Sequence, residues 1–441
     1  NMSKKVFVKS FGCQMNEYDS EKIEDILGSK KNLSQTDSPE DADLIVLNTC
    51  SVREKAEVKL FSDLGRYRKL KETKPHIQIA VGGCVASQEG EEIIKRAPYV
   101  DAVFGPQTLH RLPELINLRE VTGKPQIDIS FPEIEKFDNL PTSKSKNPSA
   151  MVSIMEGCSK YCSFCVVPYT RGEEISRPLD DIITEIIQLT LQGASEIILL
   201  GQNVNGYRGL MSSGKIANFA SLIEYISEIE EVKRIRFTTS HPNEMNDHLI
   251  DCFGNIKKLA NHLHLPIQSG SDKVLMAMKR NYTTLEYKSI IKKLRKKLPN
   301  VSLTTDLIIG FPTETTNDFN LTKKLFIELD FDYSFSFIYS KRPGTPAAYL
   351  KDETTSEEKL ERLHEIQSIN ITQGESYTKK MIGTTQRVLI DHFSKKKPGV
   401  MLGKTDNNRI IEFKESKDLL NKFVNVKVMK ILGKSLVGEL V

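Results

Sequence analysis

The sequence lacks any run of apolar residues near the roughly 18–20 that a membrane-spanning helix needs. We also expect no secretory leader, because residues 2–5 lead straight into the strand-like Val6-Phe7-Val8. We therefore expect a protein that is neither secreted nor bound to a membrane, and that works in the cytoplasm.

Cysteine is scarce and odd in number, with seven residues in a chain of 441. An odd count in a long chain without a leader argues against a framework of disulfides. The pattern instead indicates thiols that stay reduced for metal binding or catalysis.

Net charge is small as well, at +4, but it is unevenly distributed. Residues 378–441 hold 14 Lys/Arg against 6 Asp/Glu, so the rest of the chain is slightly acidic. A basic C-terminal module on a non-basic body predicts that this module binds a polyanion.

The length predicts about three domains, and the pattern divides the chain accordingly. Residues 2–131 alternate short apolar runs with helical stretches, which is typical of an α/β domain with a parallel sheet. Its clearest strands are expected at 6–8, 44–47 and 77–81. Residues 132–150 are rich in turn formers and are interpreted as a linker.

A second alternating series fills the domain predicted for residues 151–380. Six strands without a seventh and eighth predict an incomplete barrel, with strands near 151–155, 196–200, 235–239, 263–267, 303–309 and 333–339. Capping-box spacing at 355–358 then opens a helix toward residue 380. The last domain, 381–441, has alternating strands and spaced glycines that indicate a small β-barrel.

Three cysteines follow the first strand of the incomplete barrel with C-x3-C-x2-C spacing, namely Cys158, Cys162 and Cys165. A structural zinc site closes with four ligands, whereas three thiols on a four-iron cluster leave one iron open for a substrate. Loops after barrel strands also carry the chemistry of such folds. The alternative is a zinc knuckle or unliganded thiols.

Cys13, Cys50 and Cys84 each follow one of the three strands of the N-terminal domain. If these strands are parallel neighbours, the three thiols meet at one edge of the sheet, where open α/β sheets bind ligands. The alternative is that each is an ordinary small buried residue. Cys252, in a helical segment, is interpreted as a buried structural thiol.

The C-x3-C-x2-C motif resembles the signature of radical S-adenosylmethionine enzymes. The resemblance implies that S-adenosylmethionine binds the open iron and is cleaved by one electron to a 5′-deoxyadenosyl radical. Strand ends such as 200–205, 239–242, 266–271 and 306–312 look like the cofactor contacts of that family, although turn formation explains any single residue equally well. The residues assigned to the cofactor are Tyr161, Phe164, Gly201, Gln202, Asn203, Ser240, Gln268, Asp306 and Tyr339.

The stretches 10–20, 47–53, 81–84 and 166–174 resemble methylthiotransferases, and are closest to the MiaB type that acts on tRNA. This implies an α/β multidomain fold with a flavodoxin-like N-terminal domain, a partial (β/α)6 barrel of the TIM type and a C-terminal TRAM barrel. It also implies a second 4Fe–4S cluster on Cys13, Cys50 and Cys84, and two molecules of S-adenosylmethionine per turnover. One would supply a methyl group for a cluster-bound sulfur. The other would activate carbon 2 of an isopentenylated adenine beside the anticodon.

The C-terminal module resembles the RNA-binding TRAM domain at 403–409 and 435–439, which assigns Lys404 and Arg409 to RNA contact. We also expect an electron donor such as flavodoxin or ferredoxin, a sulfur donor and a monomeric state. Two alternatives stay open. One is the same chemistry on threonylcarbamoyladenosine in tRNA or on a ribosomal protein residue. The other is a non-catalytic iron–sulfur protein that binds RNA, which the open cluster site disfavours.

Overall fold

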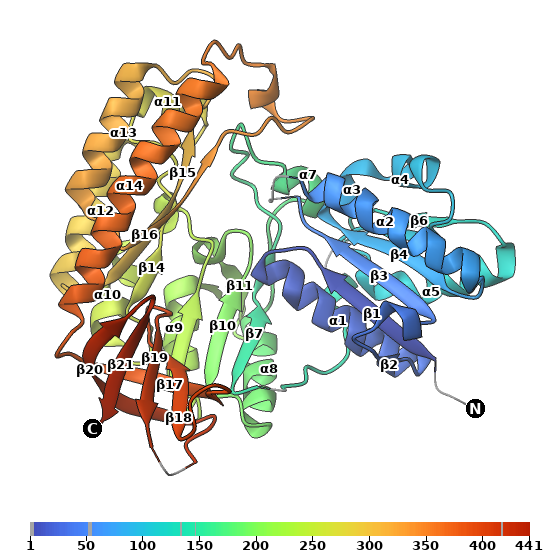
Figure 1. Ribbon diagram of the computed structural model, residues 1–441, viewed down its shortest axis with the longest axis horizontal. Coiled ribbons are helices and arrows are strands. Elements are labelled where there is room, and N and C mark those ends of the chain that lie inside the picture. The colour runs from blue at the N-terminus through green and yellow to red at the C-terminus, as the bar shows by residue number, and fades with distance from the viewer. Residues whose placement is uncertain (1–3, 52–54, 133–134, 146, 416–417) are drawn as a thin grey trace.

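The structure is a computed structural model that describes residues 4–51, 55–132, 135–145, 147–415 and 418–441. Figure 1 shows an N-terminal sheet with flanking helices, a larger half-barrel and a small C-terminal barrel. Val52 and Arg53, which belong to the motif around Cys50, lie outside the described residues.

The N-terminal domain is built on a six-stranded sheet in the order β2-β1-β3-β4-β5-β6, in which all neighbours are parallel. The strands are β1 (Lys5–Ser10), β2 (Ser34–Gln35), β3 (Leu44–Thr49), β4 (Gln78–Gly83), β5 (Ala102–Phe104) and β6 (Gln126–Asp128). β3 is buried at every position, as expected for a strand covered on both faces. Its side chains alternate, so Ile45 and Leu47 enter one apolar cluster and Leu44 and Val46 enter the other.

Helices cover both faces of this sheet, which makes the domain doubly wound as predicted. One face packs against α1 and α5, and the other against α2, α3 and α4. Their bounds are α1 (Gln14–Lys31), α2 (Ala56–Thr73), α3 (Cys84–Glu89), α4 (Glu91–Arg96) and α5 (Leu112–Thr122), with short 3-10 turns η1 (Pro39–Asp41) and η2 (Leu109–Arg111).

The stretch predicted as a linker contains a short helix, α6 (Glu135–Asp138), in which the Lys136 side chain is only 1% exposed. Turn-forming residues revealed the irregular backbone. They did not reveal the buried lysine, because its ion partners lie far away in the sequence.

Six parallel strands form the half-barrel, as the alternating pattern predicted. They are β7 (Ser149–Ser153), β10 (Glu196–Leu200), β13 (Arg234–Phe237), β14 (His262–His264), β15 (Ser302–Ile309) and β16 (Tyr333–Ile338). The two three-stranded halves meet where the Ile235 amide donates to the Lys258 carbonyl at 2.8 Å. Within the described part of the chain no ladder joins β7 to β16, so the barrel is open.

Helices cover the outside of the half-barrel (Figure 1). These are α8 (Leu179–Leu191), α9 (Phe219–Ser227), α10 (Asp247–Asn255), α11 (Asp272–Ala277), α12 (Thr284–Lys297), α13 (Thr316–Leu329) and α14 (Ser356–Lys380). The capping box predicted at Thr355 and Glu358 starts α14, and boxes of the same kind start α12 and α13.

Smaller elements fill the loops at the carboxyl ends of the strands. They are β8 (Met155–Glu156), α7 (Val167–Arg171), β9 (Ile175–Ser176), η3 (Val204–Gly206), β11 (Arg208–Leu210), β12 (Ile216–Asn218), η4 (Pro242–Glu244) and η5 (Pro346–Tyr349).

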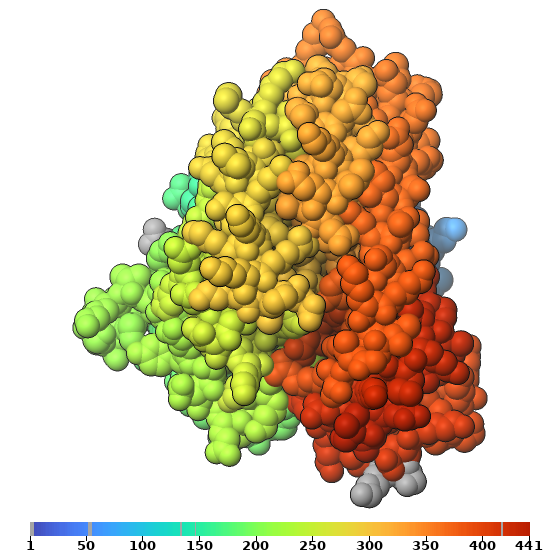
Figure 2. Space-filling model, turned by 90° about the vertical axis from the view of Figure 1, so that its left-hand side faces the viewer, coloured from blue at the N-terminus to red at the C-terminus, as the bar shows by residue number. Residues whose placement is uncertain are grey.

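The C-terminal module is a closed barrel in the order β17-β18-β19-β21-β20, as predicted. Its strands are β17 (Thr385–Phe393), β18 (Val400–Lys404), β19 (Ile410–Lys414), β20 (Phe423–Leu432) and β21 (Ser435–Leu440). Figure 2 shows this barrel packed directly against the helical body.

Buried ion pairs attach the C-terminal barrel to the amino ends of β10 and β13. Arg234 and Glu196 are the first residues of these strands, and Arg234 also contacts Asp406 of the barrel at 3.1 Å. Arg387 binds the same Asp406 at 2.8 Å. Among the described residues, no helix is both long and apolar enough to cross a membrane.

Candidate active site

The thiols of the N-terminal domain converge at the carboxyl edge of its sheet. Cys13 is the N-cap of α1 after β1, Cys50 follows β3, and Cys84 opens α3 after β4. Because β1, β3 and β4 are parallel neighbours, their ends meet, and the sulfur atoms of Cys13 and Cys50 lie 3.8 Å apart. The convergence predicted from strand topology is confirmed for these two thiols.

Two glycines let the cysteine loops approach this closely. A Cβ atom on Gly12 would lie 2.6 Å from the Cβ of Cys50. Gly83 has a φ of +90°, and a Cβ there would lie 2.2 Å from the Thr49 carbonyl oxygen. Only glycine combines this backbone conformation with this space.

Asn16 holds the loops together, a role that the local sequence pattern did not reveal. Its Oδ1 accepts from the Phe11 amide at 3.0 Å, while its Nδ2 donates to the Thr49 carbonyl at 3.0 Å. Thr49 extends the network, since its hydroxyl donates to the Gly82 carbonyl at 2.6 Å. Asn16 is 1% exposed, so these bonds lie in a desolvated interior.

The second group of thiols lies in the loop that follows β7 and β8, where the motif predicted it. Cys162 is buried, and Cys158 and Cys165 are partly buried. Burial, with a smaller contribution from the nearby Cys162, raises the pKa of Cys158 to about 11 and that of Cys165 to about 12. Protonated thiols at neutral pH suit a site that a metal completes, because metal binding displaces the protons.

Arg280 supports this loop and was not identified from the sequence. Its Nη1 donates to the Cys162 sulfur at 3.4 Å, and its Nη2 donates to the Pro266 carbonyl at 2.9 Å. The guanidinium also donates to the Tyr282 hydroxyl at 3.0 Å. Arg280 therefore ties the Cys162 loop to the strand end at Pro266.

Three of the residues assigned to S-adenosylmethionine carry buried polar atoms that have no hydrogen-bond partner within the described chain. These atoms are Oδ1 of Asn203, Oε1 of Gln268 and the hydroxyl of Tyr339. Each belongs to a strand end of the half-barrel. Gln268 also has a φ of +72°, an uncommon conformation for a residue other than glycine. Unpaired buried acceptors and local strain fit a polar ligand.

Other assigned residues already have protein partners. The Gln202 side chain accepts from the Gly157 amide at 2.7 Å, the Ser240 hydroxyl donates to the His264 carbonyl at 2.8 Å, and Asp306 pairs with His264 at 3.3 Å. These contacts shape the loops.

The remaining assigned residues lie around the thiol loop. Tyr161 is 40% exposed and packs edge-to-face on Tyr169. Phe164 packs on the main core, and a Cβ on Gly201 would lie 2.4 Å from the Met155 sulfur.

The two thiol loops lie next to each other. α3 begins at Cys84, and it packs against α7, which begins two residues after Cys165 (Figure 1). The Gln107 side chain of the N-terminal domain also donates to the Arg171 carbonyl at the end of α7, at 2.7 Å.

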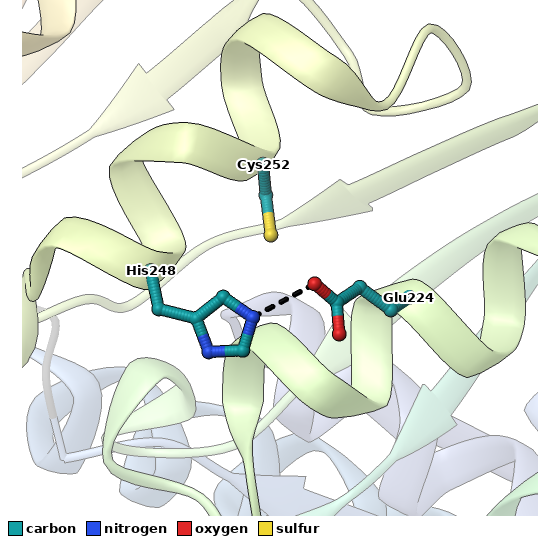
Figure 3. Close-up of side chains that lie close together, drawn as sticks. All are labelled: Glu224, His248 and Cys252. Carbon is teal, nitrogen blue, oxygen red and sulfur yellow. Dashed lines mark hydrogen bonds and ion pairs between the residues drawn. The ribbon is translucent and has the colours of Figure 1, made fainter.

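Cys252 lies apart, beside Glu224 and His248 (Figure 3). His248 Nε2 contacts the Glu224 carboxylate at 2.7 Å, while its Nδ1 faces the Asn218 amide nitrogen at 3.5 Å. Metal binding at Nε2 would move the ring proton to Nδ1, where it would face another donor. Burial raises the pKa of Cys252 to about 12. The trio is therefore a hydrogen bond between His248 of α10 and Glu224 of α9 beside a buried thiol, which is consistent with the structural role predicted for Cys252.

The two residues assigned to RNA differ in their surroundings. Lys404 is exposed at the end of β18. The Arg409 guanidinium instead forms a two-pronged pair with Asp332 at 2.6 and 2.8 Å, which ties the barrel to the body.

Family models match three parts of the chain. They are described as the uncharacterized protein family UPF0004 (residues 5–105), the radical SAM superfamily (152–326) and the TRAM domain (379–441).

Among solved structures, the radical S-adenosylmethionine methyltransferase TsrM from Kitasatospora setae, with cobalamin and a 4Fe–4S cluster bound, superposes with a TM-score of 0.57 and 14% identity. The match covers 79% of this chain and 74% of that one. The cobalamin-dependent S-adenosylmethionine radical enzyme OxsB gives a TM-score of 0.53 at 11% identity, covering 86% and 56%. These likenesses show the fold.

Sequence relatives are much more similar. The tRNA-2-methylthio-N(6)-dimethylallyladenosine synthase of Methylobacillus flagellatus is 59% identical over 441 residues, covering 100% of both chains. The enzyme of that name from Chromobacterium violaceum is 59% identical over 436 residues, covering 99% of this chain and 98% of its own. The chain therefore belongs to the family of the tRNA-2-methylthio-N(6)-dimethylallyladenosine synthases.

Proposed function

We propose that this chain is an enzyme that adds a methylthio group to carbon 2 of isopentenyladenosine next to the anticodon of tRNA. Its full-length relatives carry the name of this activity, in agreement with the resemblance found in the sequence. The observation that carries the proposal is the packing of α3, which begins at Cys84, on α7, which follows the loop of Cys165.

Cys158, Cys162 and Cys165 would hold a 4Fe–4S cluster with one open iron, and S-adenosylmethionine would bind there. The fit rests on three soft donors in one loop and on the unpaired atoms of Asn203 and Gln268 at the neighbouring strand ends. The cluster and cofactor supply a 5′-deoxyadenosyl radical when bound.

Cys13, Cys50 and Cys84 would hold a second 4Fe–4S cluster, the site at which sulfur is delivered. The fit rests on the sulfur atoms of Cys13 and Cys50, which lie 3.8 Å apart, and on Gly12 and Gly83, where a side chain would press on Cys50 and on the Thr49 carbonyl. Two molecules of S-adenosylmethionine per turnover follow, one as methyl donor and one as radical source.

The substrate is assigned through the family and through the C-terminal barrel. Lys404 is exposed on that barrel, and its charge suits phosphate contact. A cytoplasmic location, a monomeric state, a sulfur donor and an electron donor such as flavodoxin or ferredoxin belong to the same proposal.

The test is mass spectrometry of tRNA nucleosides from cells that lack this protein. Loss of the methylthio group from isopentenyladenosine is expected, with restoration by the wild-type chain. If the methylthio group were lost from threonylcarbamoyladenosine or from a ribosomal protein residue instead, that nucleoside or residue would be the substrate and isopentenyladenosine would not. Purified enzyme should hold about eight irons and form 5′-deoxyadenosine with a reductant. Absence of this product would refute the radical mechanism.

A further inference from the structure

Four charged side chains form a closed ring between the two thiol loops. Asp19 contacts Lys136 at 2.9 Å and Arg171 at 3.0 Å. Glu156 contacts the same two cations, each at 2.9 Å. All four side chains are at most 4% exposed, and two acids balance two bases.

The ring joins parts of the chain that are distant in sequence. Asp19 lies on α1 of the N-terminal domain, 117 residues from Lys136 on α6 and 152 residues from Arg171 on α7. Buried ion pairs add little stability compared with apolar residues of the same volume, so stability alone does not explain such a ring. A fixed geometry between domains does explain it.

The members of the ring flank the cysteines. Asp19 lies six residues after Cys13, Glu156 two residues before Cys158, and Arg171 six residues after Cys165. Three of the four charges are therefore connected by a short piece of backbone to one of the two thiol loops, and Lys136 of α6 completes the ring.

Arg171 lies in the electrostatic range of the N-terminal thiols although it belongs to the half-barrel. Burial opposes its charge, but Cys84, Asp19, Glu156 and Cys13 together hold the pKa of its guanidinium well above the usual range. The geometry agrees, because α7 ends at Arg171 and packs against α3, which begins at Cys84. Three thiolates on a cluster make an anionic site, and a buried cation beside it favours the more negative state.

We propose that Arg171 is a positioning residue for the second cluster, which fixes that cluster against the radical-forming site and raises its reduction potential. The inference rests on the function proposed above. The guanidinium reaches Asp19 with one nitrogen and Glu156 with the other, a fork that lysine cannot reproduce. Lysine at position 171 keeps the positive charge and loses the fork, whereas glutamine loses the charge, so the two contributions of Arg171 can be tested separately.

The experiment compares Arg171→Gln, Arg171→Lys and Arg177→Gln in enzyme loaded with both clusters. Arg177 is the matched control, because it is a partly buried arginine of the half-barrel, 12% exposed, that pairs with Glu185 instead. Three quantities are measured: methylthio transfer, 5′-deoxyadenosine formation and the potential of the second cluster. The potential is followed by electron paramagnetic resonance in a background with alanine at 158, 162 and 165.

Arg171→Gln is expected to lower methylthio transfer by about tenfold to a hundredfold, to leave deoxyadenosine formation within about twofold, and to make the potential more negative. Arg171→Lys is expected to keep the potential close to that of the wild type and still to lose transfer. It also provides the test if the glutamine variant does not fold.

An unchanged potential in Arg171→Gln would overturn the electrostatic role, and wild-type transfer in Arg171→Lys would overturn the geometric one. Equal loss of both activities in Arg171→Gln and Arg177→Gln would reduce Arg171 to a structural residue. If the wild type itself transferred no methylthio group, the proposed function would fail, while the shift in potential would still test the placement of Arg171.

Discussion

The six clustered cysteines divide into two groups that the structure holds in different ways. Arg280 touches Cys162 in the half-barrel, whereas Asn16 ties together the loops that carry Cys13 and Cys50. Each group has its own support, so the loss of one thiol should affect mainly the cluster to which it belongs.

We expect Cys162→Ala to abolish deoxyadenosine formation, because the radical-forming cluster loses one of three ligands. Cys50→Ala should spare cleavage of S-adenosylmethionine and lose methylthio transfer. Both products can be quantified by chromatography of the same reaction. Equal loss of both products in both variants would contradict separate roles.

His241 makes the stability of the fold dependent on pH. Burial, together with the positive charges of Arg280 and Lys160, lowers the pKa of this histidine to about 2, and its Nδ1 accepts from the Asn243 amide. The unfolded chain takes up the proton near pH 6.5, whereas the folded chain does not. The stabilisation is therefore complete above about pH 6.5 and is lost progressively as the pH falls below it.

The thermal midpoint of cluster-free protein is therefore expected to fall between about pH 7.5 and pH 5.5. The thermal midpoint of the His241→Asn variant should fall less over the same pH range, because asparagine accepts the same hydrogen bond without titrating. Scanning calorimetry at the two pH values measures the difference. An identical fall in both proteins would show that other groups dominate.

Local spacing was sufficient to predict that Cys158, Cys162 and Cys165 share one loop, because C-x3-C-x2-C is a contiguous pattern. The predicted order of parallel strands was sufficient to predict that Cys13 and Cys50 lie close together. The roles of Asn16, Arg171 and Arg280 were not predictable, because each depends on a partner 33 to 152 residues away. Contacts of that kind leave no periodic signal in a single sequence.

At the level of elements, long strands and capped helices were predicted well and short strands were not. β3 begins with four consecutive apolar residues, β15 is eight residues long, and α14 begins at a capping box that is visible in the sequence. β2 has only two residues and β6 three, too few to establish an alternation. α6 was missed because a single turn of helix has no apolar stripe.

The turn between β4 and α3 is the element most sensitive to a small change. We expect Gly83→Ala to destabilise the N-terminal domain by roughly 1–3 kcal/mol through its backbone conformation alone. The added methyl group would also press on the Thr49 carbonyl and displace the loop of Cys50. The variant should bind about four irons in place of eight while still cleaving S-adenosylmethionine.

Gly214→Ala is a suitable control for this prediction. Gly214 also has a positive φ, of +81°, but a Cβ there would meet open space. Its iron content should match that of the wild type. Full iron content in Gly83→Ala would show that the turn can relax.

At the level of the whole molecule, the C-terminal barrel is expected to supply affinity for RNA independently of the chemistry. Lys404→Ala should weaken tRNA binding and reduce the salt dependence of the binding constant by about one unit of slope. Lys288→Ala on α12, where the lysine pairs with Glu328, is the control outside the barrel. Fluorescence titration at several salt concentrations measures both, and equal slopes in the two variants would exclude Lys404 as a phosphate contact.

The place where the barrel is attached limits which RNA molecules can be substrates. Arg234 and Glu196 fix the barrel to the first residues of β13 and β10, whereas the thiols lie beyond the last residues of the strands. A five-residue strand is about 16 Å long, so recognition and reaction are separated by at least that span. A free nucleoside is shorter than this span, so a substrate that contacts both the barrel and the thiol loops must carry its base on an extended polymer.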